Sequence, residues 1–157
     1  MEAASNDAVD RSIRSYRDDL DRADSLADLL AIGDTLRRCE RDNGSVTFMA
    51  QVMAGAQHDP VLTRAAHYAM SAWIRELKAV LDRVLRHGGL AEVIDIDGLA
   101  PLIATGFIGL GLYEAVDPTA ATAAVAALES LGALVTTLDG LGPMARRAVR
   151  AATRRRN

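Results

Sequence analysis

The chain contains 157 residues, of which half are hydrophobic and only 4% are aromatic, and its net charge is -3. This length predicts a single domain that can bury a core, and the abundance of Ala and Leu favours helices. The charge is not typical of a nucleic-acid-binding protein, and the single cysteine, Cys39, excludes a disulfide within the chain. We therefore expect one all-α domain over residues 1–157, a helical bundle of about seven helices.

Charge is distributed unevenly along the chain. Residues 1–44 carry seven basic and eleven acidic side chains, whereas residues 117–157 carry six basic and three acidic ones. The first ten residues are acidic and lack the apolar segment of a signal peptide. Together with the single cysteine, this pattern predicts a cytoplasmic protein.

The first two predicted helices are amphipathic. In residues 6–22 the apolar side chains recur every three or four positions and therefore share one helical face; they are Val9, Ile13, Tyr16 and Leu20. Ser25 and Asp28 resemble a capping box, which starts a second helix. The pair Asn43-Gly44 is a stop signal that ends it.

A short third helix and a long fourth helix follow. Ser45 is the predicted N-cap of the third helix, residues 46–57, which has almost no polar face and is therefore expected to be internal. Asp59 and Pro60 are predicted to start the fourth helix, which runs to about His87. Its polar side chains form one stripe that includes His67, so His67 is expected to face solvent.

Residues 97–139 read as two helices that are apolar on nearly every face. Asp97 is the predicted cap of the first helix, and Asp117-Pro118 is predicted to start the second. Helices that are apolar all round need cover on all sides, so we expect one side of this pair to meet another chain. The longest uncharged run has 16 residues, fewer than the roughly 20 of a membrane span. We therefore expect no membrane insertion. A final basic helix is predicted over residues 144–155.

No metal, cofactor or catalytic motif emerges. The spacing of His58, His67 and His87 fits no common zinc site. The mid-helix glycines between residues 106 and 111 follow no strand, so they do not form a nucleotide-binding loop. We therefore expect no enzyme. A helical-bundle enzyme is kept as an alternative. Glu114 with His58 is the pair of ionisable groups to examine for it.

The order of the helices, together with three segments, resembles the C-terminal regulatory domain of the tetracycline-repressor (TetR) family of bacterial regulators. The segments are His58-Asp59-Pro60, the run DIDGLAPLIATGFIGLGLYEAVDP at 95–118, and LDGLGPMARRAVR at 138–150. The resemblance implies that residues 98–116 and 118–139 form a homodimer interface and that the preceding helices can enclose a small hydrophobic ligand.

The resemblance also implies the residues of both sites. The expected pocket consists of Phe48, Met49, Val52, Met53, Met70, Trp73, Ile74, Phe107 and Tyr113. The expected dimer interface consists of Leu102, Thr105, Gly106, Gly109, Ala121, Ala124, Leu128, Leu131 and Val135.

The DNA-binding half of such regulators has no counterpart in this sequence. It precedes the regulatory helices in the family, whereas residues 1–44 are acidic and contain no helix-turn-helix pattern. We therefore expect no direct DNA binding by this chain alone. The chain could be a truncated regulator or a stand-alone sensor. An alternative function is that of an antirepressor that pairs with a full-length regulator.

Overall fold

The computed structural model describes residues 2–88 and 94–140, which form six α-helices and no strand. The helices are α1 (Glu2–Arg22), α2 (Leu26–Asn43), α3 (Ser45–Gly55), α4 (Pro60–Gly88), α5 (Ile96–Glu114) and α6 (Pro118–Gly140). The all-α prediction is confirmed. The predicted helix over residues 144–155 lies outside the described residues, so the described part has six helices where about seven were expected for the chain.

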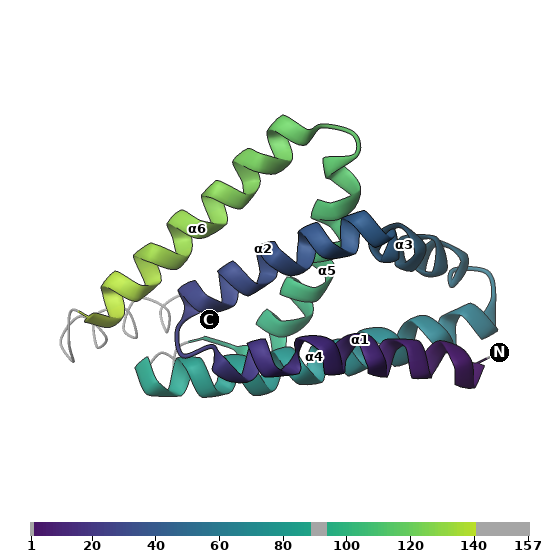
Figure 1. Cartoon of the computed structure of the whole chain (residues 1–157), viewed down its shortest axis with the longest axis horizontal. Coiled ribbons are helices and arrows are strands. Elements are labelled where there is room, and N and C mark those ends of the chain that lie inside the picture. Colours follow the sequence, from purple (N-terminus) through teal and green to yellow (C-terminus); the bar gives the residue numbers. More distant parts are fainter. Residues whose placement is uncertain (1, 89–93, 141–157) are drawn as a thin grey trace, which may run out of the picture.

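The helices form a base and an arm (Figure 1). Helices α1 and α4 lie side by side along the base, and α5 rises from α4 towards the α3 end of α2. After a tight turn, α6 runs back past α2 and contacts α5 and α2. The α5–α6 hairpin therefore extends from the base as an arm that is held by α2.

The main hydrophobic core lies in the base. It joins the end of α1, the start of α2, the second half of α4 and the start of α5, through Leu20, Ala23, Leu29, Val80, Leu81, Val84, Leu85 and Ala100. Leu81 and Ala100 are 0% exposed. No described residue of α6 belongs to this cluster. Helix α6 therefore depends on separate contacts for its position.

Local capping signals explain most helix boundaries. The Ser25 hydroxyl accepts a hydrogen bond from the Asp28 amide at 3.1 Å, and the Asp28 carboxylate accepts one from the Ser25 amide at 2.9 Å. This reciprocal pair confirms the predicted capping box. Gly44 ends α2 with a positive φ of 77°, a conformation that other residues adopt at a cost. Pro60 and Pro118 begin α4 and α6 as predicted.

Two predicted caps were wrong. Ser45 is the first residue of α3 rather than its N-cap, because Gly44 serves both α2 and α3 and makes no side-chain cap. Helix α5 begins at Ile96, and its N-cap is Asp95, whose side chain accepts a hydrogen bond from the Asp97 amide. Both errors are shifts of one or two residues, the usual precision of helix boundaries.

The prediction that the third helix is internal was also wrong. Val46 is the one described residue of α3 that is buried, whereas Phe48 is 62% exposed. Helix α3 packs against α2, α4 and α5, but no described helix covers its outer side. An apolar composition shows that a helix prefers cover, but it does not show that its own chain supplies that cover.

Two glycines provide a test of this packing. A Cβ atom at Gly111 would lie 2.7 Å from Cγ1 of buried Val46, whereas one at Gly33 would meet no atom within 4 Å. Gly33→Ala should therefore stabilise the fold by about 1 kcal/mol through helix propensity. Gly111→Ala should destabilise it, because overpacking against a stiff branched side chain costs about 1–3 kcal/mol. Urea denaturation at equal protein concentration measures both, and a stabilised Gly111→Ala variant would contradict the close contact.

Candidate functional site

Helix α5 has an inner and an outer face. Ala100 and Ala104 are 0% and 8% exposed and face the chain. The opposite side carries exposed residues that recur every three or four positions, which places them in one row. We define the α5 stripe as Leu102, Thr105, Gly106, Gly109, Leu112 and Tyr113. Leu102 is 66% exposed, so the row is open along its length.

Helix α6 repeats this division. We define the α6 stripe as Ala124, Leu128, Leu131 and Leu134, which are all exposed. The three leucines are 50%, 57% and 54% exposed, and their spacing of three or four places them on one side. Ala121 and Val135 were also expected at the interface, but Ala121 is buried within the chain and Val135 is half-buried. The other expected interface residues belong to one of the two stripes.

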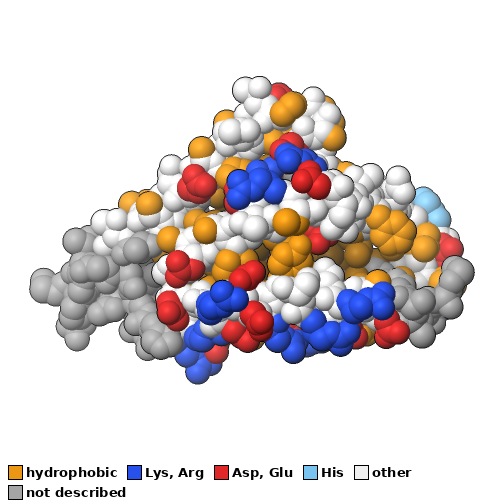
Figure 2. Space-filling view, in the orientation of Figure 1, with side chains coloured by type: hydrophobic (Ala, Val, Ile, Leu, Met, Phe, Trp, Pro, Cys, Tyr) orange, Lys and Arg blue, Asp and Glu red, His pale blue; other side chains and the backbone are white. Residues whose placement is uncertain are grey.

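The exposed apolar surface of the arm contrasts with the base. Figure 2 shows Lys, Arg, Asp and Glu side chains gathered over the base and over α2, while the α6 edge is mostly uncharged in this view. By length and composition, Ile96–Glu114 and Pro118–Val135 could each cross a membrane, and only 11% of each stretch is buried. The single chain therefore leaves most of this apolar pair uncovered, and the expectation that another chain covers it stays a prediction.

The glycines of α5 have different surroundings. Gly111 accommodates Val46, as described above, whereas a Cβ at Gly106 or Gly109 would meet no atom within 4 Å. A glycine inside a helix costs about 1 kcal/mol relative to Ala, and the chain itself offers no packing reason for these two. Gly33 shows that an open glycine alone does not mark an interface. Gly106 and Gly109 differ from it because they lie within a row of exposed apolar side chains.

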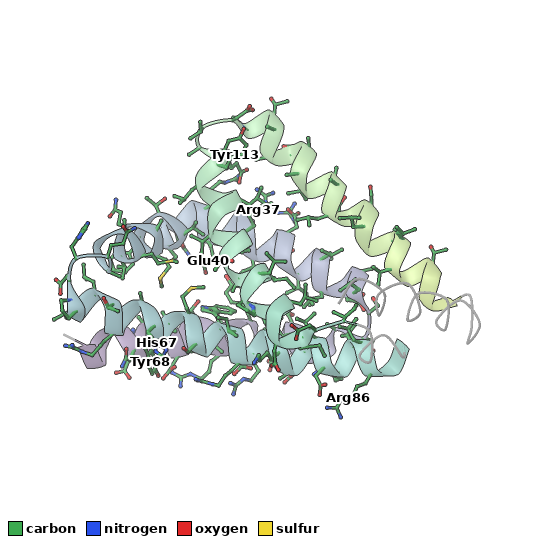
Figure 3. The ribbon with its side chains drawn as sticks, turned by 180° about the vertical axis from the view of Figure 1, so that it is seen from behind. Arg37, Glu40, His67, Tyr68, Arg86 and Tyr113 are labelled. Carbon is green, nitrogen blue, oxygen red and sulfur yellow. The ribbon has the colours of Figure 1, made fainter. Side chains whose placement is uncertain are left out.

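An ion cluster fastens the tip of the arm to α2. The Glu114 carboxylate, in the last turn of α5, accepts hydrogen bonds from Arg37 at 2.5 Å and from Arg41 at 2.9 Å. Arg37 also donates to Asp34 at 2.8 Å. The side chains of Arg37 and Glu114 are each only 15% exposed. Figure 3 shows Arg37 near the end of α5, beside the turn that leads to α6.

The cluster keeps Glu114 charged. The hydrogen bond from Arg37 lowers the pKa of Glu114 below its ordinary value of 4.5, and the positive charges of Arg37 and Arg41 add to this effect. The same contacts raise the pKa of Arg37, with the hydrogen bond to Glu114 as the largest cause. A carboxylate in this position therefore acts as an anchor and not as a proton donor at neutral pH.

Sequence reasoning missed this cluster, although a signal was present. Glu114 is the single charged residue between Asp97 and Asp117, and a charge in an apolar helix that packs on its neighbours needs a partner. Arg37 and Arg41 are four residues apart on one face of α2. The pairing of Glu114 with Arg37 spans 77 positions, so only the fold brings the partners together.

The residues expected to form a ligand pocket are divided between packed and exposed positions. Seven of them are half-buried side chains of α3, α4 and α5, namely Met49, Val52, Met53, Met70, Trp73, Ile74 and Phe107. Trp73 packs against Tyr16, with ring centroids 6.3 Å apart. Phe48 and Tyr113 are 62% and 47% exposed and lie at the surface.

A groove of about 470 Å³ lies elsewhere, where the second half of α4 faces the start of α5. Its lining includes charged side chains of both signs, and Lys78 forms an ion pair with Asp97 across it at 2.5 Å. None of the residues expected to line the ligand pocket contributes to this groove. Its charged lining differs from that of a typical site for an apolar ligand.

The ionisable groups considered for catalysis do not converge. Glu114 pairs with Arg37 and Arg41, whereas His58 is exposed in the link between α3 and α4. His67 is exposed on α4, as predicted. Within residues 2–88 and 94–140, no group of three or more His, Cys, Asp or Glu side chains could hold a metal ion.

The lowered pKa of Glu114 leads to a test of the cluster. Glu114→Gln should destabilise the fold at neutral pH by about 1–3 kcal/mol, because it leaves the buried part of Arg37 with a weaker partner. The charged Glu114 stabilises the folded state above its unfolded pKa, near 4.5, and this contribution disappears as the pH falls through the lowered folded pKa.

The difference in unfolding free energy between wild type and Glu114→Gln should therefore shrink below about pH 4.5. Urea denaturation across this range measures it. Exposed Glu129 on α6 supplies the matched control, since Glu129→Gln makes the same chemical change away from the cluster. A difference for Glu114→Gln that does not depend on pH would contradict the charge-based account.

Comparisons of the chain with protein-family models, with curated proteins and with solved structures found no match. The resemblance to TetR regulatory domains therefore rests on the sequence pattern, and the family assignment stays a prediction.

Proposed function

We propose that this chain is a TetR-like regulatory module that forms a homodimer through the α5 and α6 stripes. The observation that carries the proposal is the pair of exposed apolar rows on neighbouring helices, with Leu102 66% and Leu131 57% exposed. Contiguous exposed apolar surface of this kind marks interaction sites in soluble proteins. A second copy presents the same rows, so a two-fold arrangement can cover both at once.

The energetics favour a whole row over a single contact. Full burial of one large apolar side chain contributes about 1.5–3 kcal/mol, whereas association costs about 4–15 kcal/mol in lost freedom. A partner must therefore cover several of these side chains together, and the two stripes carry five leucines between them. Gly106 and Gly109 have open space above them, which lets a second helix approach closely, as small residues do in packed helix pairs.

The α5 and α6 stripes contain no charged side chain. Glu129 is the one charged residue in the chain between Asp117 and Asp139, and its position along α6 places it away from the α6 stripe. A self-pairing row without charges avoids like-charge repulsion across the two-fold axis. The chain as a whole carries a net charge of -3, so an interface between copies benefits from this separation.

The dimer can be tested by charge insertion. Wild type should sediment as a dimer at micromolar concentration, and Ala124→Glu or Gly109→Glu should shift it to monomer, because each would bury a charge without a partner at a cost of several kcal/mol. Each 1.4 kcal/mol weakens association tenfold, so the dissociation constant should rise by about a hundredfold or more.

Ala8→Glu is the matched control for this experiment. Ala8 is exposed on α1, which packs mainly against α4, and it lies outside both stripes. A monomeric wild type would overturn the dimer, and binding of wild type to phosphatidylcholine vesicles in place of self-association would identify a membrane surface as the occupant. Recovery of wild type from its native lysate with a different regulator would support the antirepressor alternative.

Sensing of a small hydrophobic ligand is the second part of the proposal. It is supported by the adaptable Met side chains of α3 and α4, which pack against each other. Three of these side chains are half-buried, namely Met49, Met53 and Met70. An apolar ligand that inserts there would stabilise the fold by mass action, by about 2.7 kcal/mol at a hundredfold excess over its dissociation constant.

A thermal-shift screen of apolar metabolites tests this part. Trp73 is the single tryptophan of the chain and lies three residues after Met70 on α4, about one helical turn away, so its fluorescence reports on this part of α4. A hit should raise the melting temperature and shift the Trp73 emission together. Met53→Glu should abolish both effects, whereas Ala54→Glu, at an exposed neighbour, should leave them intact. Hits that stabilise Met53→Glu equally would contradict binding at this place.

A further inference from the structure

The arm, whose helix α5 also packs on α4 and α3, meets α2 along one face of that helix. Leu30, Asp34, Arg37 and Arg41 follow one another at spacings of four, three and four, which places them in one row along the helix. At one end of this row, a Cβ at Gly132 of α6 would lie 2.4 Å from Cδ1 of Leu30. At the other end, Arg37 and Arg41 hold Glu114. The hairpin therefore contacts α2 at two places, one on α6 and one at the end of α5.

The two attachments differ in strength. The inner face of α6 presents small residues to α2, such as Ala121 and Gly132, and small side chains bury little apolar area. Glu114, by contrast, receives charge-assisted hydrogen bonds from two arginines, which are stronger than neutral ones. The position of the arm's tip on α2 should therefore depend more on Glu114 than on the apolar contact between α6 and α2.

Removal of the Glu114 carboxylate would leave Arg37 with one partner fewer inside the protein. The Arg37 side chain is 15% exposed, and its Nε atom is buried with no hydrogen-bond partner among the described residues. Without Glu114 the guanidinium would have one more donor to satisfy inside the protein, and it would move towards water. Because only three residues separate Glu114, the last residue of α5, from Pro118, the first residue of α6, such a movement would release the turn that sets the angle between the two helices.

We propose that Glu114 is a positioning residue for the dimer interface, through which the Leu30–Arg41 row of α2 sets the orientation of the α6 stripe relative to the α5 stripe. Glu114 itself lies outside both stripes and faces α2. The affinity between two copies therefore depends on an ion cluster inside each chain, and any change in α2 that opens the cluster weakens the dimer. This inference rests on the proposed homodimer.

The experiment uses two readouts on the full chain. The first is the dimer dissociation constant by sedimentation equilibrium. The second is the distance distribution between spin labels on α2 and α6, measured by double electron–electron resonance in an excess of unlabelled chain. Cys39 is the single cysteine and is exposed on α2, and Ser130→Cys adds a second label site at an exposed position of α6.

Glu114→Gln should raise the dissociation constant by about tenfold, within the roughly 5- to 150-fold range of coupled sites, and should broaden the distance distribution. Glu129→Gln should change neither. If Glu114→Gln does not fold, Arg41→Gln takes its place, because Arg41 is half exposed and its loss removes one partner only; a smaller change in both readouts is then expected.

The outcomes separate the two proposals. A dimeric wild type whose folded Glu114→Gln variant shows unchanged affinity and an unchanged distance distribution overturns the positioning role and leaves the dimer intact. A monomeric wild type overturns the proposed function, while the distance distribution in Glu114→Gln still decides whether the cluster orients the arm. Broadening in Glu129→Gln as well would overturn the role of Glu114, because the arm would then respond to any lost charge.

Discussion

The α5–α6 hairpin is covered by its own chain on one side only, and this constraint organises the rest of the molecule. Its inner face supplies Ala100 to the core and places Gly111 on Val46. Its outer faces keep leucines such as Leu102 and Leu131 more than half exposed. Contact between these side chains and water is unfavourable. The base therefore buries its apolar side chains within the chain, whereas the arm leaves many of its own exposed.

Two kinds of contact join the arm to α2, and their physical properties differ. Apolar contact between α6 and α2 is limited by the small side chains on α6, whereas the Glu114 cluster depends on charge and hydrogen-bond geometry. A largely buried charged cluster is weak support for stability as such, because desolvation offsets much of the attraction. The cluster instead fixes orientation. Its hydrogen bonds are directional and set the relative placement of α2 and the end of α5, which apolar contacts do not.

Sequence reasoning succeeded where the determinants are local. The capping box of Ser25 and Asp28, the stop at Gly44 and the proline starts of α4 and α6 each depend on a few adjacent residues. It failed for the short apolar helix α3, whose Phe48 is exposed, because hydrophobic residues indicate a need for cover and not its source. It also missed the cluster around Glu114, whose partners on α2 are more than 70 positions away in the chain.

The sequence by itself determined the all-α class, most helix boundaries, the exposed polar stripe of α4 and the apolar character of the arm. These properties follow from periodicity and from contacts within one or two helical turns. Only the tertiary structure decided which apolar faces are buried and which remain open, which glycine accommodates a neighbour, and which arginines hold Glu114. Those outcomes depend on distances between helices that are far apart in the chain, and short-range patterns do not encode such distances.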